Sequence, residues 1–413
     1  MKKYYIATYG CQMNESDSER IAGTLEKAKY KLALSIDKAD LIVVNMCSVR
    51  QTAVDRIYGI AQKLKKLKKE NNELKTILTG CILKKDRKKL SEKFDYVLDI
   101  NNLPRWPIFK QSLLKNYLEI KPKYQSSFSA LVPIMTGCNN FCSYCVVPYV
   151  RGREVSRPAD KIICEIKNLI KKEYKEIWLL GQNVNSYKSG KVNFPKLLKK
   201  VNNIPGKFWV RFTSSHPKDF SDELIEAMAN CKKVTEYLNF PVQSGDNKIL
   251  KKMNRPYTIK HYKNLIKKIR SKIPNIVLST DIIVGFPGET KKQFENSVKL
   301  FGEIKYDMAY ISQYSPRPET SAVKLKNNVP QKEKKRRKEV LNEILKETAL
   351  KNNGEYIGKE AEALIDGQKK NKWLGKTRSY KNIQVESSKN LLGKFIKIKI
   401  TKALPWGLKG ELL

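Results

Sequence analysis

The stretch Leu131-Val-Pro-Ile-Met-Thr-Gly-Cys-Asn-Asn-Phe-Cys-Ser-Tyr-Cys145 decides the fold of the 413-residue chain. It joins an apolar segment, typical of a buried strand, to three cysteines in a CxxxCxxC spacing, Cys138, Cys142 and Cys145. Three thiolates on one strand-to-helix turn can hold three irons of a [4Fe–4S] cube and leave the fourth iron open. An open iron can bind S-adenosylmethionine (SAM) and pass it the electron that cleaves it to a carbon radical. The stretch therefore predicts an iron–sulfur cluster with SAM as its partner.

Zinc is the alternative metal for these cysteines. Structural zinc sites use four ligands, usually in two paired groups. The triplet supplies three, and a histidine cannot complete the set locally because the chain has only two, His216 and His261. The spacing therefore favours the cluster over zinc.

Length and composition bound the class of protein. A chain of 413 residues with 41% hydrophobic residues is expected to form two or three globular domains. No apolar run approaches the ~18 residues that cross a bilayer, and the N-terminus lacks a secretory signal. We therefore expect a cytoplasmic protein with no membrane partner. Its eight cysteines are then expected to be ligands or free thiols rather than disulfides.

The charge of the chain is strongly positive, with 82 Lys and Arg against 41 Asp and Glu. A net charge of +41 attracts polyanions and predicts salt-dependent binding to nucleic acid. The alternative is a general bias in composition, because lysines occur nearly everywhere, as in Lys63–Lys69. We expect a nucleic-acid partner, with most single lysines serving only as solvated surface.

Short strands alternate with helices over residues 1–120. Near-continuous apolar strands in a βαβα pattern predict an α/β fold with a doubly wound parallel sheet. Polar residues from Asn14 onward predict the start of the first helix. The expected strands are Tyr4–Thr8, Leu41–Val44, Thr76–Thr79 and Tyr96–Ile100.

Three further cysteines follow the first three of these strands. Cys11, Cys47 and Cys81 are separated by 36 and 34 residues, each about one βα repeat. They should therefore converge at the carboxyl edge of the sheet, where open α/β folds bind ligands. We predict a second [4Fe–4S] cluster there, again with one open iron. The alternative is that cysteine packs well at strand ends.

A second series of βα units follows a linker expected near residues 121–129. Six strands with helices between them, such as 159–172 and 258–272, predict a partial (βα)6 barrel of the TIM type. Functional groups of such barrels lie on loops at the carboxyl ends of strands, and the first cysteine triplet follows the first strand. The expected strands are Leu131–Met135, Ile177–Leu180, Phe208–Phe212, Tyr237–Phe240, Val277–Ile283 and Met308–Gln313.

The end of the chain has a different pattern. A charged helix is expected from Val329 to about Asn353, followed by short alternating strands. Residues 355–413 hold thirteen Lys or Arg against six Asp or Glu, a net of +7, and a small basic all-β barrel of this kind suits RNA. The alternative is a module that only packs on the larger barrel. We expect strands at Glu362–Asp366, Leu391–Ile400 and Leu408–Leu413, and domains at 1–120, 128–350 and 354–413.

Several motifs together make the chain similar to a known family, the radical-SAM methylthiotransferases. The most specific is Gly137–Pro158, which opens Gly-Cys-Asn-Asn-Phe-Cys-Ser-Tyr-Cys and closes Glu-Val-Ser-Arg-Pro. The segment Ala403–Glu411 resembles the family's TRAM domain, so the resemblance covers essentially the whole chain. Further matching motifs are Gly10-Cys-Gln-Met-Asn14, Asn45-Met-Cys47, Thr79-Gly-Cys81, Leu180-Gly-Gln-Asn183, Pro241-Val-Gln-Ser-Gly245, Ser279–Thr290 and Tyr314–Pro318.

Within the family the chain most resembles the branch that adds a methylthio group to C2 of N6-isopentenyladenosine at position 37 of tRNA, next to the anticodon. Two sister activities remain as alternatives, on threonylcarbamoyl-adenosine in tRNA and on an aspartate of a small-subunit ribosomal protein. One departure is visible, because Glu319 stands where the family usually has glycine. The shape of that loop is therefore an open question.

The resemblance implies two [4Fe–4S] clusters and SAM. The cluster on Cys138, Cys142 and Cys145 would bind SAM, and the cluster on Cys11, Cys47 and Cys81 would carry or donate sulfur, which a second SAM methylates. It also implies tRNA as partner and an electron donor such as a flavodoxin or ferredoxin. The sulfur source, the tRNAs read and the oligomeric state are left open.

Residues beside the first triplet and at strand ends are the expected contacts to SAM. Tyr144 can stack on adenine, or can be a core aromatic beneath the loop. The strand-end residues can bind SAM through backbone and amide groups, or can form ordinary turns. These residues are Gly181, Gln182, Asn183, Gln243, Ser244 and Gly285.

Three arginines and two cysteines complete the candidates. Arg151, Arg153 and Arg157 closely follow the triplet and are expected to hold RNA phosphate, to position the sheet domain or to form surface ion pairs. Cys164 and Cys231 fall in helical stretches outside both triplets and are predicted to be buried packing residues.

Overall fold

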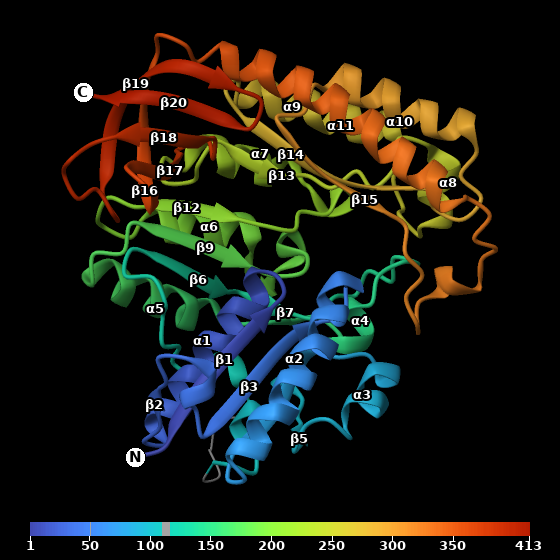
Figure 1. Cartoon of the computed structure of the whole chain (residues 1–413). Coiled ribbons are helices and arrows are strands. Elements are labelled where there is room, and N and C mark those ends of the chain that lie inside the picture. Colours follow the sequence, from blue (N-terminus) through green and yellow to red (C-terminus); the bar gives the residue numbers. More distant parts are fainter. Residues whose placement is uncertain (50, 110–115) are drawn as a thin grey trace.

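Five parallel strands form an N-terminal sheet domain, in the order β2-β1-β3-β4-β5. The computed structural model describes residues 1–49, 51–109 and 116–413, and Figure 1 shows this domain in blue at the bottom. Its central strands are apolar runs because both of their faces are covered. The strands are β1 (Lys3–Tyr9), β2 (Lys31–Leu32), β3 (Leu41–Cys47), β4 (Lys75–Cys81) and β5 (Tyr96–Val97).

Helices cover both faces of this sheet, which confirms the predicted doubly wound α/β arrangement. Helix α1 (Gln12–Lys27) packs on the face that presents Leu41 and Val43. Helices α2 (Gln51–Glu70) and α3 (Lys84–Leu90) lie on the opposite face. Strand β5 stops short of its predicted end because the side chain of Asp99 accepts a hydrogen bond from the Asn101 amide and starts a 3-10 turn.

Six parallel strands form the central partial barrel, which confirms the predicted (βα)6 architecture. They pair as two sheets, β6-β9-β12 and β13-β14-β15, joined through an isolated parallel bridge between Val210 and Val234. The strands are β6 (Ser129–Pro133), β9 (Glu176–Leu180), β12 (Trp209–Phe212), β13 (Tyr237–Asn239), β14 (Val277–Val284) and β15 (Met308–Gln313).

Helices cover the outer face of the partial barrel and bury its apolar core. Within the part of the chain that the structure describes, each helix is too short or too polar to cross a bilayer. The covering helices are α5 (Ala159–Lys171), α6 (Phe194–Asn202), α7 (Asp222–Asn230), α8 (Asn247–Lys252), α9 (Ile259–Lys272), α10 (Lys291–Ile304) and α11 (Gln331–Gly354). The short helix α4 (Val147–Val150) instead packs on the end of β4. The partial barrel therefore has a covered outer face, and its inner face is the one available for ligands.

Short hairpin strands lie at the edges of the partial barrel. The strand expected at 131–135 ends two residues earlier, and the chain continues as β7 (Met135–Thr136), which pairs antiparallel with β8 (Val155–Ser156). Strands β10 (Lys188–Ser189) and β11 (Val192–Asn193) form a second small hairpin. The loop with the first cysteine triplet connects β7 to β8, and the pairing of these two strands holds the two ends of the loop together.

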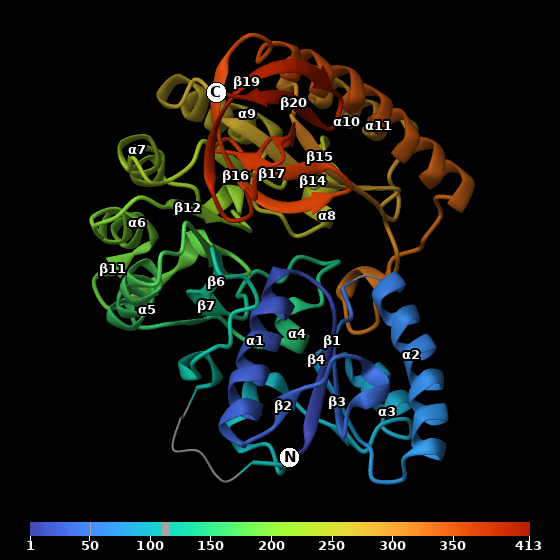
Figure 2. The same cartoon turned by 60° about the vertical axis from the view of Figure 1, so that its left-hand side comes forward.

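A closed five-stranded barrel ends the chain, in the order β16-β17-β18-β20-β19. Sequence patterns predicted three of these strands and missed β17 and β18, which are short and carry few apolar residues. Figures 1 and 2 show the barrel in red, packed against the partial barrel and away from the sheet domain. The strands are β16 (Glu360–Lys369), β17 (Lys372–Thr377), β18 (Asn382–Glu386), β19 (Phe395–Leu404) and β20 (Gly407–Leu412).

One buried arginine fixes the position of this C-terminal barrel. Arg211 of β12 donates to the carboxylate of Glu176, at 2.6 Å, and to the backbone oxygens of Thr377 and Arg378, at 3.0 and 2.8 Å. Glu176 is the first residue of β9, so the C-terminal barrel docks at the amino ends of the partial-barrel strands. Their carboxyl ends, where the cysteine triplet lies, remain on the side of the sheet domain.

Candidate functional site

The loop after β7 holds the first cysteine triplet in one shape. Gly137 has a φ of +74°, and a Cβ there would lie 2.0 Å from the backbone oxygen of Arg153. The Cys138 amide donates to the backbone oxygen of Gly152, at 3.2 Å, which ties the loop to the turn before β8. Only glycine fits position 137, so the Gly-Cys pair of the motif is required by this close approach.

All three cysteines of the triplet open into one cavity of about 240 Å³ at the carboxyl ends of the strands. Three polar atoms lining it are buried and have no hydrogen-bond partner among the described residues: Gln182 Oε1, Ser215 Oγ and His216 Nε2. Buried polar atoms in folded proteins are almost always paired. These atoms therefore fit a polar ligand beside the cysteines, and SAM, with its carboxylate, amine and adenosine, meets that requirement.

Arg255 is a residue of this cavity that the sequence analysis missed. Its Nη1 donates to Cys142 Sγ at 3.7 Å, its Nη2 to the Pro241 backbone oxygen at 2.9 Å, and its Nε to the Tyr257 hydroxyl at 3.0 Å. Nothing marks it among the many basic residues of the sequence. Its burial beside a cysteine sulfur is visible only in three dimensions.

Burial controls the protonation of the groups in the cavity. Burial first, and then the nearby Arg255 guanidinium, lower the pKa of His216 to about 2, so its imidazole is neutral. Burial raises the pKa of the Cys145 thiol to about 12. A thiolate at Cys145 therefore needs a bound cation to stabilise it, which fits an iron ligand.

The structure separates the predicted SAM contacts into two groups. Tyr144, Gln182 and Gln243 line the cavity together with the cysteines. Gly181 instead packs against Met135, and Asn183 donates to the carboxylate of Asp219 at 2.7 Å. Ser244 accepts a hydrogen bond from the Asp246 amide and begins the turn into α8.

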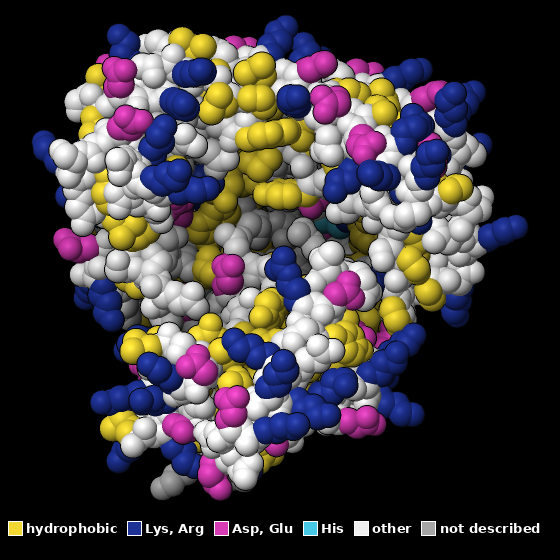
Figure 3. Space-filling view, in the orientation of Figure 1, with side chains coloured by type: hydrophobic (Ala, Val, Ile, Leu, Met, Phe, Trp, Pro, Cys, Tyr) yellow, Lys and Arg dark blue, Asp and Glu magenta, His cyan; other side chains and the backbone are white. Residues whose placement is uncertain are grey.

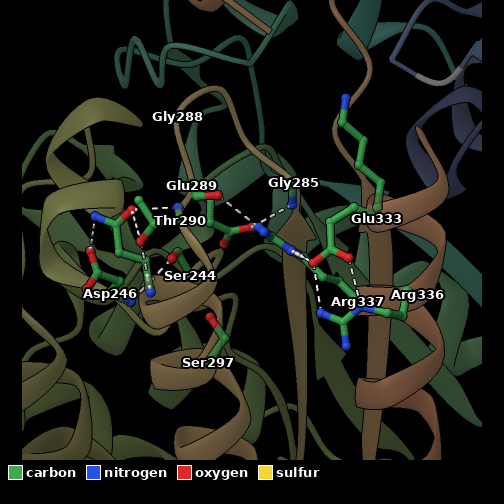
Figure 4. A network of polar contacts seen from close by, with 12 residues as sticks. Ser244, Asp246, Gly285, Gly288, Glu289, Thr290, Ser297, Glu333, Arg336 and Arg337 are labelled. Atoms are coloured by element: carbon green, nitrogen blue, oxygen red, sulfur yellow. Dashed lines mark hydrogen bonds and ion pairs between the residues drawn. The ribbon is translucent and has the colours of Figure 1, made fainter. Parts of the chain in front are cut away.

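Gly285 belongs to a separate polar network, shown in Figure 4. Its amide donates to Glu289 Oε2 at 2.6 Å, and Arg337 Nη1 donates to the same oxygen at 2.7 Å. Both side chains of this ion pair are buried. Gly285 thus helps to join the loop after β14 to α11, away from the cysteine cavity.

The second cysteine triplet converges at the carboxyl edge of the sheet domain. Cys47 and Cys81 are the last residues of β3 and β4 and are register partners. A hydrogen bond between their side chains lowers the pKa of Cys47 and raises that of Cys81. Cys11 caps α1 directly after β1. The strand order reverses between β1 and β3, so the triplet lies at the topological switch point, where such sheets bind ligands.

Two buried asparagines hold Cys11 in place. Asn14 Oδ1 accepts from the Cys11 amide at 3.3 Å, and Asn14 Nδ2 donates to Asn45 Oδ1 at 3.0 Å. A Cβ at Gly10 would lie 2.3 Å from Asn14 Oδ1. The motif from Gly10 to Asn14 thus fixes the first cysteine against the end of β3.

The arrangement of the cysteines bears on the kind of metal group they could hold. Within residues 1–49, 51–109 and 116–413, no group of three or more His, Cys, Asp or Glu side chains is arranged to hold a single metal ion. The ligands of a [4Fe–4S] cube each bind a different iron, so three cysteines on one loop, such as Cys138, Cys142 and Cys145, fit that group. Of the other cysteines, Cys231 is buried as predicted, whereas Cys164 is exposed on α5, so its predicted burial is wrong.

The three arginines after the first triplet have different surroundings. Arg151 is buried between the domains and donates to Asp17 Oδ2 at 2.7 Å and to Cys81 Sγ at 3.0 Å. Arg157 is buried against the Glu165 carboxylate. Arg153 is exposed, with its guanidinium 4.4 Å from the centre of the Phe141 ring. Arg153 is thus the member of the three that RNA can reach.

The loop after β15 contacts both cysteine sites. Glu319 has a φ of +69°, so the loop keeps the left-handed conformation expected for glycine. Its carboxylate accepts the Lys84 amide at 2.7 Å, at the start of α3 and three residues after Cys81. The Ala322 amide donates to the Ser143 backbone oxygen at 2.7 Å, between two ligands of the first triplet. The loop therefore spans the two sites.

Three family models match the chain. The Radical SAM superfamily matches residues 132–301, the uncharacterized protein family UPF0004 residues 3–100, and the TRAM domain residues 354–413. Among solved structures, the radical S-adenosylmethionine methyltransferase TsrM from Kitasatospora setae superposes with a TM-score of 0.55 at 13% identity, covering 78% of this chain and 75% of that one. This similarity supports the fold.

Curated relatives match over the full length. The tRNA-2-methylthio-N(6)-dimethylallyladenosine synthase of Clostridium novyi is 44% identical, over 100% of this chain and 97% of the relative. That of Carboxydothermus hydrogenoformans is 42% identical, over 100% and 99%. The chain belongs to the tRNA-2-methylthio-N(6)-dimethylallyladenosine synthase family of radical SAM proteins.

Proposed function

We propose that the chain is a radical SAM methylthiotransferase that adds a methylthio group to C2 of N6-dimethylallyladenosine, next to the anticodon of tRNA. The observation that carries the proposal is the presence of two three-cysteine sites at the carboxyl ends of parallel strands, joined by the hydrogen bond from Arg151 to Cys81. Carbon C2 of adenine carries no acidic proton, so acid–base chemistry is poorly suited to activating it. Because the substrate is tRNA, we place the reaction in the cytoplasm.

The first cysteine triplet would hold a [4Fe–4S] cluster, and the cavity beside it would hold SAM. When bound, this pair supplies the radical chemistry that opens an aromatic C–H bond. Gln182, Ser215 and His216 would bind polar groups of SAM through their unpartnered atoms. Arg255 would orient Cys142 and contribute positive charge next to a carboxylate. With its pKa near 2, His216 acts as a hydrogen-bonding group and not as a general acid.

Cys11, Cys47 and Cys81 would hold a second [4Fe–4S] cluster, which would supply the sulfur to be transferred. Cys47 and Cys81 are register partners at the ends of neighbouring strands, which brings their side chains together at this site. An electron donor such as a flavodoxin or ferredoxin completes the proposal, because reductive cleavage of SAM consumes one electron.

The inner face of the partial barrel offers a route for the adenosine. Asp281 lines the cysteine cavity, and its register partner on β15 is Tyr310, whose side chain is 43% exposed. Side chains of register partners on adjacent parallel strands point to the same face. Figure 3 shows a hollow on this side in which hydrophobic side chains gather, with Lys and Arg around it. An adenine base of tRNA that enters this hollow would reach the cavity, and the Lys and Arg side chains around the hollow would bind the tRNA phosphates.

The same surface favours one substrate over its sister. The dimethylallyl group is a branched hydrocarbon, and an exposed tyrosine ring gives it apolar area to cover. The threonylcarbamoyl group carries a carboxylate, for which this tyrosine provides no countercharge. The names of the full-length relatives agree with the dimethylallyl substrate.

Nucleoside mass spectrometry of tRNA tests the proposal. A strain lacking this protein should accumulate N6-dimethylallyladenosine without its methylthio group, and the wild-type chain should restore the modification. Cys47→Ala should fail to restore it, although the purified variant should still cleave SAM under reductant. Cys164→Ala, an exposed cysteine outside both sites, is the matched control and should restore modification fully. Unchanged nucleosides in the deletion strain would refute the substrate, and equal loss of both activities would refute the division between the two sites.

A further inference from the structure

One short helix connects the two cysteine sites. Cys145, the last ligand of the first triplet, is followed by Val146 and by α4, and Arg151 caps the helix at its far end. A helix of four residues is roughly 6 Å long. Arg151 then reaches across the domain boundary to Cys81, the last residue of β4. The same segment therefore carries a ligand of one site and a hydrogen-bond donor to the other.

The guanidinium of Arg151 uses three nitrogens for three partners. Its Nε donates to Cys81 Sγ at 3.0 Å, its Nη2 to Asp17 Oδ2 at 2.7 Å, and its Nη1 to the Tyr117 hydroxyl at 3.5 Å. Asp17 lies on α1 and is fully buried. Because the guanidinium is planar and pairs with Asp17, its Nε–H bond points toward the Cys81 sulfur. A lysine ammonium, with its flexible stem, could not hold both contacts in this geometry.

The surroundings of this contact are dry. Cys81 packs in one apolar cluster with Leu83, Val146 and Val150, which joins the end of β4 to α4. Cys81 and Arg151 are 3% and 4% exposed. Electrostatic interactions are stronger in such a setting than in water, because few water dipoles screen them.

We propose that Arg151 is a positioning residue that sets the reduction potential of the cluster on Cys11, Cys47 and Cys81 through its hydrogen bond to the Cys81 sulfur. This inference rests on the proposed second cluster. Hydrogen bonds to cluster sulfurs favour the reduced state, which carries one more negative charge. The potential of this cluster, relative to the first, decides on which of them an entering electron rests.

Two variants separate this role from a purely structural ion pair. Asp17→Asn keeps the donor and removes a negative charge near the cluster, so it should make the cluster easier to reduce. The double variant Asp17→Asn with Arg151→Gln removes the donor without leaving an unpaired buried charge, so it should make the cluster harder to reduce. A purely structural ion pair would leave the double variant at the parent potential, because that variant removes one positive and one negative charge together, and would change only its stability.

The test uses the full chain carrying Cys138→Ala, Cys142→Ala and Cys145→Ala, so that the second site is the one that can load iron. After anaerobic reconstitution, the midpoint potential is measured by titration with dithionite, which delivers electrons singly as the sulfur dioxide radical anion, and is followed by electron paramagnetic resonance. We expect about a tenfold shift in the reduction equilibrium for each variant, in opposite directions, which is about 59 mV for one electron. Arg255→Gln is the matched control, because that buried arginine serves the other site, and it should leave the potential unchanged.

Each outcome decides. Equal potentials in the parent and the double variant, or a shift of the same size in Arg255→Gln, would overturn the role of Arg151. A parent chain that binds no iron would overturn the second cluster itself, and the inference with it. If the double variant does not fold, judged by circular dichroism, Arg151→Lys replaces it. That variant keeps the charge but loses the fork, so it should shift the potential in the same direction by a smaller factor, and an unshifted potential would count against the proposal.

Discussion

Glu319 offers a quantitative test of how the loop after β15 is held. Its left-handed backbone costs about 1 kcal/mol relative to glycine. Its carboxylate accepts the Lys84 amide at 2.7 Å in the first turn of α3, a contact of the kind that is worth about 1 kcal/mol at helix N-termini. The contact therefore offsets the strain, which explains how this chain keeps glutamate at a position suited to glycine.

Three substitutions separate the two contributions. Glu319→Ala loses the hydrogen bond and keeps the strain, so it should destabilise the protein by about 1 kcal/mol. Glu319→Gly loses the same hydrogen bond but relieves the strain. After allowance of about 0.4–1 kcal/mol for the greater freedom of glycine in the unfolded chain, it should be more stable than the alanine variant by up to about 0.6 kcal/mol. Glu319→Gln keeps an acceptor oxygen and is the matched control, expected within about 0.5 kcal/mol of wild type.

Hydrogen exchange and chemical denaturation together provide the assay. Amide exchange in Lys84–Leu90 should accelerate about fivefold in both the alanine and glycine variants, because about 1 kcal/mol of local stability is lost. Denaturation should rank the variants with glutamine first, then glycine, then alanine. Unchanged exchange in Glu319→Ala, or a glutamine variant as unstable as alanine, would refute the reasoning.

Three further predictions address stability and substrate binding. Burial raises the pKa of the Glu19 carboxyl from its ordinary 4.5 to about 7 in the folded chain. The protonated carboxyl therefore stabilises the folded state, and this contribution is lost as the pH rises from about 4.5 through 7. Glu19→Gln should therefore flatten the fall in thermal midpoint between pH 5 and pH 8, and an unchanged slope would contradict it. Arg337→Met should cost about 3–5 kcal/mol in denaturation because it leaves Glu289 buried and unpaired, whereas pairing it with Glu289→Gln should recover more than half of that loss. Tyr310→Ala should raise the KM for dimethylallyl-tRNA about tenfold with little change in SAM cleavage without tRNA, and an unchanged KM would exclude Tyr310 from the substrate route.

The sequence was most informative where local pattern alone determines structure. The CxxxCxxC spacing places Cys138, Cys142 and Cys145 on one loop whatever the rest of the chain does, and all three line one cavity. The apolar runs predicted the central strands because parallel strands are buried on both faces. The convergence of Cys11, Cys47 and Cys81 also followed from strand order, because the carboxyl ends of parallel strands share one edge.

Features that depend on tertiary packing were not predictable in this way. Strand β2 has exposed residues only, and β17 has lysines and a glycine among its apolar positions, so neither shows a strand pattern. Gly285 and Ser244 follow strands whose ends face the cavity, yet a hydrogen bond directs each toward a neighbouring loop residue. The position of a residue after a strand predicts at which edge of the sheet it lies. Its hydrogen-bond partner, known only from the structure, decides whether it faces the ligand.

The two uses of positive charge in this chain explain why its functional arginines are hard to recognise. A net charge of +41 suits tRNA, and most of it lies on lysines at the surface. Several arginines are instead buried at junctions: Arg151 between the domains, Arg211 beneath the C-terminal barrel, and Arg337 between a loop and α11. The planar guanidinium can serve several acceptors at once, which a lysine ammonium on a flexible stem does less well. The charge count therefore indicates the RNA-binding character of the chain, whereas burial identifies the arginines that join its domains and loops.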